Sequence, residues 1–230
     1  MWDKITLYKF QEVDAINNKN IEEIDKMLFT ICMVFDYTEY QLDNLPLKKV
    51  NKLTNKVTKI FSSDFTEKIY KRIGWYFIDA DVSKLTFGQY IEVAFFLSNG
   101  PLLNAHYVMA SISHTLWNKN NADKHRKKAE YFLNQPITKI MGNLKLIIEN
   151  FTAFNNEYKA LFGLDREVSG DVQEDKFNKR YGWIFSASQI AEYERINLEE
   201  AFKLPIRQAL NDLSYLKAKA LYESEQIKRN

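Results

Sequence analysis

The sequence predicts an all-α protein, mainly a helical bundle, with at most a minor short hairpin near Trp75 or Trp183. Glycine and proline are scarce, at 7 and 4 in 230 residues, and β-sandwiches need many turns built from them. Apolar residues recur at helical spacing in several stretches. Capping-box patterns begin at Thr38, Thr86 and Asn197. Hydrophobic residues make up 46%, which argues against disorder.

The first third of the chain predicts four helices. A short helix fits 5–13, and a strong apolar period marks 21–35, with Asn20 as its expected cap. A brief helix opens at Thr38 and ends before Pro46. A longer helix then covers 50–61, because Val50, Leu53, Val57, Ile60 and Phe61 share one face.

The middle of the chain predicts a hairpin or an extended connector, followed by three helices. Residues 75–78 are short and β-prone, and they follow Gly74. The helix that opens at Thr86 is expected to bury Tyr90, Ile91, Ala94, Phe95 and Phe96. The helix at 102–117 is apolar on most faces, which favours a central place in the core. A further helix, 137–158, begins near Pro136.

The carboxyl end predicts a long, kinked helix that packs against another helix. Asn197 and Glu200 cap it, and Pro205 removes a backbone hydrogen bond, so the helix should kink or restart at Leu204. Its apolar seam repeats with a period near 3.5, as helix-to-helix contacts do. The candidate interaction residues are therefore Phe202, Ile206, Leu210, Leu213 and Leu216.

A Gly-Trp-x-Phe element occurs twice, at 71–77 and at 179–185. Chance combined with tryptophan packing explains the pair, and so does a degenerate duplication of one helical unit. In either case we expect Trp75 and Trp183 to be structural anchors in the core. If Trp183 is fully buried, replacing it with alanine should cost about 3–5 kcal/mol.

The domain organisation follows from the placement of polar and glycine-containing stretches. We expect a helical core domain at 1–162, a loop or linker at 163–178, and a carboxyl-terminal part at 179–230, unless the whole forms one continuous domain. The segment 162–175 is the expected hinge.

Charge and hydropathy weigh against several function classes, although a weak nucleic-acid contact stays open. With 32 basic and 30 acidic side chains, the net charge of +2 does not favour a nucleic-acid binder. The basic run 124–128 could touch phosphate or an acidic partner, although such runs are more often solvated. No apolar run approaches the roughly 20 residues of a membrane span, and the amino terminus has no signal-peptide pattern.

The titratable residues form no catalytic pattern. His106 and His114 are eight residues apart, whereas metal ligands on adjacent helical turns are three or four apart. With His125 they fit core or surface positions, and Cys32 fits a buried hydrophobic position. The sequence contains no phosphate-binding glycine loop, nucleophile elbow or zinc-protease motif. We expect no enzyme activity, no metal and no cofactor.

The chain resembles a small helical structural or assembly protein of the crAss-like tailed phages, which infect Bacteroides-type bacteria. The stretches that carry this resemblance are 5–10, 35–43 and 177–216, together with a usage rich in Asn, Lys and Ile. The resemblance implies a role in the virion or in its assembly. It also implies phage structural proteins as partners, a homo-oligomer, and a location in the virion and the infected cytoplasm.

Three hypotheses follow. The first is a non-enzymatic virion protein of the portal, neck or tail region, either a ring subunit at the head–tail junction or a cargo protein ejected with the genome. The second is a tail-assembly chaperone that is absent from the mature particle. The third is an enzyme, such as a nuclease or lysis factor, for which the residues offer no support.

Overall fold

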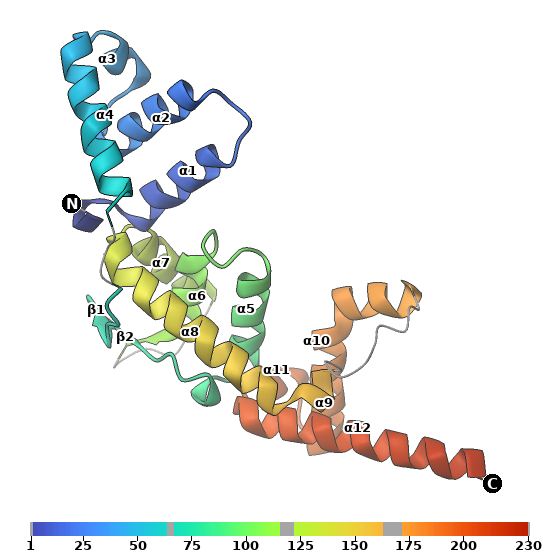
Figure 1. The fold of residues 1–230 in the computed structure, drawn as a ribbon. Coiled ribbons are helices and arrows are strands. Elements are labelled where there is room, and N and C mark those ends of the chain that lie inside the picture. Colours follow the sequence, from blue (N-terminus) through green and yellow to red (C-terminus); the bar gives the residue numbers. More distant parts are fainter. Residues whose placement is uncertain (1, 64–66, 116–121, 163–171, 230) are drawn as a thin grey trace. The chain divides into compact units, whose positions relative to one another are not determined.

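The computed structural model describes residues 2–63, 67–115, 122–162 and 172–229 (Figure 1). It confirms the all-α prediction: twelve α-helices and a three-stranded sheet of short strands lie within these ranges. Contacts divide the chain into unit 1, residues 1–78 and 99–145, and unit 2, residues 79–98 and 146–230. This division differs from the predicted one, because 79–98 and 146–162 group with the carboxyl-terminal part. Most of the predicted linker and hinge lies outside the described residues.

Unit 1 begins with a group of helices around an apolar cluster. Its helices are η1 (Trp2–Lys4), α1 (Leu7–Asn17), α2 (Glu23–Phe35), α3 (Glu39–Asp43), α4 (Leu47–Phe61), α6 (Ala105–Ser111), α7 (Ala122–Leu133) and the start of α8 (Ile137–Glu157). Helix α2 lies between α1 and α4 (Figure 1). Ile31, Leu42, Leu53 and Val57 form the buried cluster that joins α2, α3 and α4. Burying such side chains is the main favourable term for this group.

The capping predictions in this region have mixed outcomes. The box at Thr38 is confirmed, because its side chain accepts from the Gln41 backbone N–H and Gln41 accepts in return from the Thr38 N–H. The expected cap at Asn20 is wrong. Helix α2 begins three residues later, and its N-cap residue, Glu22, makes no side-chain capping bond.

The predicted hairpin near Trp75 is confirmed. Strands β1 (Arg72–Ile73) and β2 (Tyr76–Ile78) are antiparallel, and Gly74 allows the turn between them with φ +58°. The third strand, β3 (Ser113–His114), pairs with β2. It lies inside the stretch 102–117 predicted as helix, so that prediction is wrong at its carboxyl end.

The two Gly-Trp-x-Phe elements fold differently. The first forms the hairpin, whereas the second lies within helix α10 (Val172–Glu194). The duplication hypothesis therefore has no structural counterpart. Trp75 is 77% exposed, so its predicted role as a core anchor is wrong. Its indole lies at the tight turn, where Arg72 stacks near its ring at 5.9 Å.

Unit 2 is built around a cluster of aromatic rings. Its elements are η2 (Val82–Lys84), α5 (Phe87–Ser98), the rest of α8, α9 (Lys159–Phe162), α10, α11 (Leu198–Lys203) and α12 (Ile206–Arg229). Tyr90 is buried, and its ring stacks on Phe151 at 4.9 Å and meets Trp183 edge-on at 5.9 Å. These contacts tie α5, α8 and α10 together.

The break predicted at Pro205 is confirmed. Leu204 is extended, with ψ 147°, so the expected long helix is divided into α11 and α12. The extended residues pair with the start of α5: Phe87 N–H donates to Leu204 O at 2.8 Å, and Ile206 N–H donates to Leu85 O at 3.0 Å. The proline thus ends one helix where a backbone bridge anchors the next.

Candidate interaction groove

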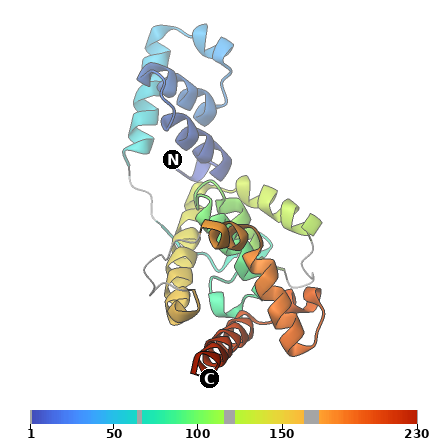
Figure 2. The same ribbon diagram turned by 90° about the vertical axis from the view of Figure 1, so that its right-hand side faces the viewer.

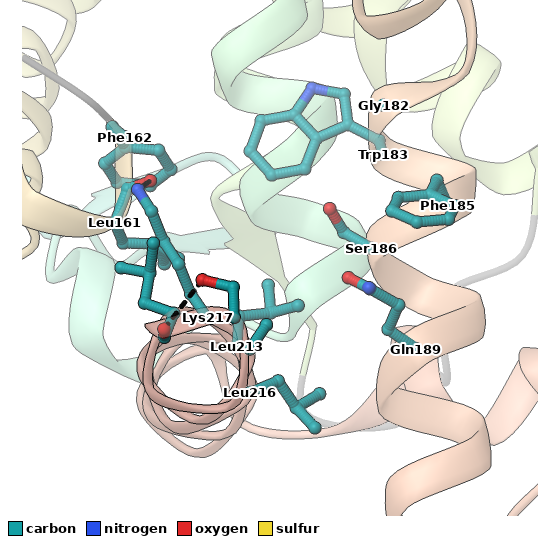
Figure 3. Close-up of a pocket in the computed structure, with 13 residues that line it drawn as sticks. Leu161, Phe162, Gly182, Trp183, Phe185, Ser186, Gln189, Leu213, Leu216 and Lys217 are labelled. Carbon is teal, nitrogen blue, oxygen red and sulfur yellow. Dashed lines mark hydrogen bonds between the residues drawn. The ribbon is translucent and has the colours of Figure 1, made fainter. Parts of the chain in front are cut away.

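A groove of about 930 Å³ lies between α9, α10 and α12 in unit 2 (Figure 3). Trp183 and Phe185 come from α10, Leu213 and Leu216 from α12, and Phe162 from α9. The remaining lining residues are Leu161, Gly182, Ser186, Gln189, Lys217, Ala220, Leu221 and Ser224. Apolar walls with a few polar groups are typical of a surface that accepts another apolar element.

Lys217 has a structural role at the edge of the groove. Its ammonium donates to the carbonyls of Ala160 and Leu161 at 2.6 and 2.7 Å. These carbonyls end the short helix α9, where cations are favourable. The lining described for the groove contains no carboxylate, imidazole or thiol. The groove therefore offers shape and apolar contact, and Lys217, the charged side chain of its lining, is bonded to the carbonyls of α9.

The predicted seam of the carboxyl-terminal helix is used mostly inside the unit. Ile206 and Leu210 are fully buried, and Phe202 stacks on Phe87 at 6.0 Å. Ile206 and Leu210 are therefore not available to a partner, because their own chain covers them, whereas Phe202 is half-buried and its role in contacting a partner stays a prediction. Leu213 and Leu216 do line the groove. An apolar period near 3.5 residues shows that one face of a helix packs against another helix. It does not show whether that other helix belongs to the same chain or to a second one.

Trp183 is both an anchor and a wall of the groove. Its ring meets Phe87 and Tyr90 edge-on, at 6.0 and 5.9 Å, yet the side chain stays partly exposed. The condition for a loss of 3–5 kcal/mol, full burial, is therefore not met. Sequence reasoning missed Phe185 and Leu221, which are 50% and 47% exposed. Phe185 belongs to the repeated Gly-Trp-x-Phe element, and its apolar character is the feature of the sequence that could have marked it as an interaction residue.

Exposed apolar side chains are frequent in the carboxyl-terminal part of the chain, and two of them, Phe185 and Leu221, line the groove. Among the 18 large hydrophobic residues exposed in the described part of the chain, nine lie between 181 and 227. They are Tyr181, Ile184, Phe185, Tyr193, Leu198, Tyr215, Leu221, Tyr222 and Ile227. Large exposed apolar patches on soluble proteins mark interaction sites more often than chance.

An acidic pair joins α10 to α12 and predicts a pH dependence. Burial, together with the nearby Glu194 carboxylate, raises the pKa of Asp212 to about 6. The folded state thus holds a proton that the unfolded chain releases near pH 4. The contribution of Asp212 to stability should be fully present below about pH 4 and should fall by on the order of 1 kcal/mol as pH rises through 6. Urea unfolding at pH 4.5 and 7 would detect this fall, and Asp212→Asn should abolish it. An identical pH profile in Asp212→Asn and the unaltered protein would contradict the assignment.

The three histidines lie in separate environments within unit 1. His106 has its Nδ1 3.5 Å from Gln11 Nε2, and burial lowers its pKa. His114 stacks on Phe77 at 5.8 Å. His125 Nε2 lies 3.0 Å from the Ser111 hydroxyl, but Ser111 is only 1% exposed, so a substrate could not reach it. Among the residues that the structure describes, no three His, Cys, Asp or Glu side chains come together to hold a metal.

Two further predictions concern Cys32 and the basic run. Cys32 is half-buried on α2, and burial, aided by Glu39 and Asp43, raises the pKa of its thiol. Its thiolate is therefore disfavoured at neutral pH, as expected of a packing residue. In the basic run, Lys128 is buried, and its ammonium donates to Ser113 O at 2.7 Å. Lys128 therefore holds α7 to β3 and is not available to phosphate.

Comparison with protein-family models, curated proteins and solved structures finds no match to this chain. Across the described helices, none has both the length and the apolar character needed to cross a membrane.

Proposed function

We propose that this chain is a non-enzymatic structural protein of a tailed-phage particle, in the portal, neck or tail region. It acts there as a ring subunit at the head–tail junction or as a cargo protein ejected with the genome. The apolar groove between α9, α10 and α12 is the observation that carries the proposal, because it suits assembly with other subunits. The resemblance to crAss-like phage proteins supplies the virion context and its other structural proteins as partners.

The occupant that best fits the groove is the outer half of α12 from a second copy. Residues 218–225 of α12 are exposed, and Tyr222 and Ile227, which lie outside the groove lining, are 64% and 77% exposed. A helix with exposed apolar side chains needs a partner surface, and a groove between helices accepts one. The groove and the exposed apolar helix end both occur in this one chain. The helix end of one copy can therefore fill the groove of the next copy.

This pairing favours a ring over a cargo role. The donated surface consists of Tyr222 and Ile227 near the outer end of α12, which do not line the groove, whereas Leu221 belongs to the accepting surface together with Trp183 and Phe185. Because the two patches differ, the contact is heterologous and leaves one of each patch open in a dimer. When the same contact is repeated from subunit to subunit, the chain of subunits closes into a ring if the rotation between neighbours divides evenly into a full turn.

Analysis of purified particles tests the virion role. Mass spectrometry should find the chain in mature virions at a fixed multiple of the portal protein. A chain present in infected cytoplasm but absent from particles would indicate a tail-assembly chaperone instead and would reject the proposal.

Groove variants test the self-association. The purified chain should form oligomers larger than dimers by light scattering, and Phe185→Asp with Leu221→Asp should shift it at least tenfold toward monomer. Leu103→Asp is the matched control, since Leu103 is 62% exposed in unit 1, away from the groove residues in sequence. A monomeric unaltered chain, or equal dissociation in the control, would remove the groove from the assembly surface.

A further inference from the structure

Helix α4 carries a dense basic face that the near-zero net charge of the chain conceals. Its 15 residues, Leu47–Phe61, contain five lysines and no acidic residue. The rest of the chain holds the other 27 of the 32 basic side chains and all 30 acidic ones. Helix α4 is therefore a stretch of 15 residues in which five positive charges stand without a negative one.

The lysines share one side of the helix. They are Lys48, Lys49, Lys52, Lys56 and Lys59, and all five are exposed. At about 100° per residue, they fall within an arc of about 100°. The row from Lys48 to Lys59 is about 16 Å long at a rise of about 1.5 Å per residue. Asn51 and Asn55, also exposed, border the row with amide groups.

These ammonium groups are not used within the described part of unit 1. None of the five forms an ion pair with a described residue, and Lys56 alone has an aromatic contact, 6.0 Å above the Phe35 ring. Helix α4 lies at the edge of its helical group, with α2 along one side (Figures 1 and 2). The face is thus open and carries uncompensated charge, which costs free energy through mutual repulsion.

We propose that this face of α4 binds the phosphate backbone of duplex DNA. Phosphates occur about every 1.7 Å along the duplex axis, so a 16 Å row of lysines can meet several at once. Lysine ammonium groups serve as point charges for phosphate, and amide side chains such as Asn51 and Asn55 donate to phosphate oxygens. Backbone contacts of this kind carry no sequence information, so the binding is non-specific.

Two other anionic partners fit less well. An anionic membrane also attracts lysines, but a basic helix that lies on a membrane inserts its apolar face. The apolar face of α4 is already in the core, since Leu53, Val57 and Ile60 are 7%, 2% and 3% exposed. An acidic protein surface is disfavoured because lysine is depleted from protein–protein interfaces, where arginine and aromatic residues are enriched.

Fluorescence anisotropy of the full chain with a labelled 30-base-pair duplex tests this inference. Binding should weaken with KCl, with a slope of log K against log[salt] of about −4 to −5 if all five lysines contact phosphate. The double variant K52Q/K56Q should bind about 10- to 50-fold more weakly at 0.1 M KCl and should reduce the slope by about 1.8. A second pair, K48Q/K59Q, should give the same loss, and circular dichroism should show that both variants fold.

The control is K4Q/K19Q, which removes the same charge from two exposed lysines of the same unit. It should leave both affinity and slope nearly unchanged. Equal weakening by control and α4 variants, no DNA binding at all, or preferential binding to vesicles with about 30% anionic lipid would each overturn the inference. These results are independent of the groove in unit 2, so its variants should bind DNA through α4 as the unaltered chain does.

Discussion

Replacing Tyr90 with alanine lowers the free energy of unfolding by about 3–5 kcal/mol, the cost typical of removing a large buried aromatic side chain. Tyr90 is 1% exposed and contacts three rings, those of Phe151, Phe154 and Trp183. These rings come from α8 and α10, so the truncation leaves a cavity where three helices meet. Urea denaturation followed by circular dichroism measures the loss.

Two variants separate packing from hydrogen bonding at this position. The Tyr90 hydroxyl donates to Asn155 Oδ1 at 2.7 Å, and burial raises the pKa of Tyr90 well above its usual range. Tyr90→Phe keeps the ring, so it should cost about 1 kcal/mol. Tyr40→Ala, at a 78% exposed tyrosine, should cost less than about 0.5 kcal/mol. Equal losses from Tyr90→Ala and Tyr40→Ala would show that the aromatic cluster does not hold unit 2 together.

The helix that carries Tyr90 shows how far the sequence could predict burial. Its start at Thr86 is confirmed, because Thr86 and Gln89 exchange capping hydrogen bonds at 3.0 and 3.3 Å. Tyr90 is buried as expected, but Phe95 is 59% exposed. Helix α5 is apolar on most sides, so its sequence does not identify which face meets the core. Tertiary packing makes that choice.

The repeated Gly-Trp-x-Phe element marks a second limit of sequence reasoning. The same residues form a hairpin turn at Gly74 and a helix at Gly182. After the first copy, Asp79-Ala80-Asp81 ends the extended run, whereas the second copy lies inside α10, which continues to Glu194. Short apolar motifs follow their surroundings, and propensity is a weak guide where tertiary contacts compete.

The α4 lysines show why a total charge is a poor guide to a charged surface. The five lysines of α4, which contains no acidic residue, are offset by an excess of acidic residues in the rest of the chain, so the net charge is only +2. The contiguous run at 124–128 is easier to see, yet Lys128 is buried there. Helical spacing brings residues 48, 52, 56 and 59 together without making them contiguous. A charge count taken helix by helix would have found them.

Replacing Gly142 with alanine should lower the free energy of unfolding by about 1–3 kcal/mol, whereas glycine to alanine in an open helix raises it by about 1 kcal/mol. Gly142 lies inside α8, where its backbone passes close to Lys68. A Cβ there would be 2.3 Å from Lys68 O and 2.7 Å from Lys68 C, and a backbone cannot rotate out of the way.

The clash would also disturb a polar contact beside it. Asn143, which is 1% exposed, accepts a hydrogen bond from the Tyr70 backbone N–H at 3.3 Å. Moving the segment at Lys68 away from α8 lengthens this bond and leaves a buried amide oxygen unsatisfied. The control is Asn156→Ala, at an exposed position of the same helix, which should raise stability by a few tenths of a kcal/mol. Thermal unfolding of both variants decides the matter: a higher midpoint for Gly142→Ala would mean that α8 and the segment at Lys68 are not in close contact.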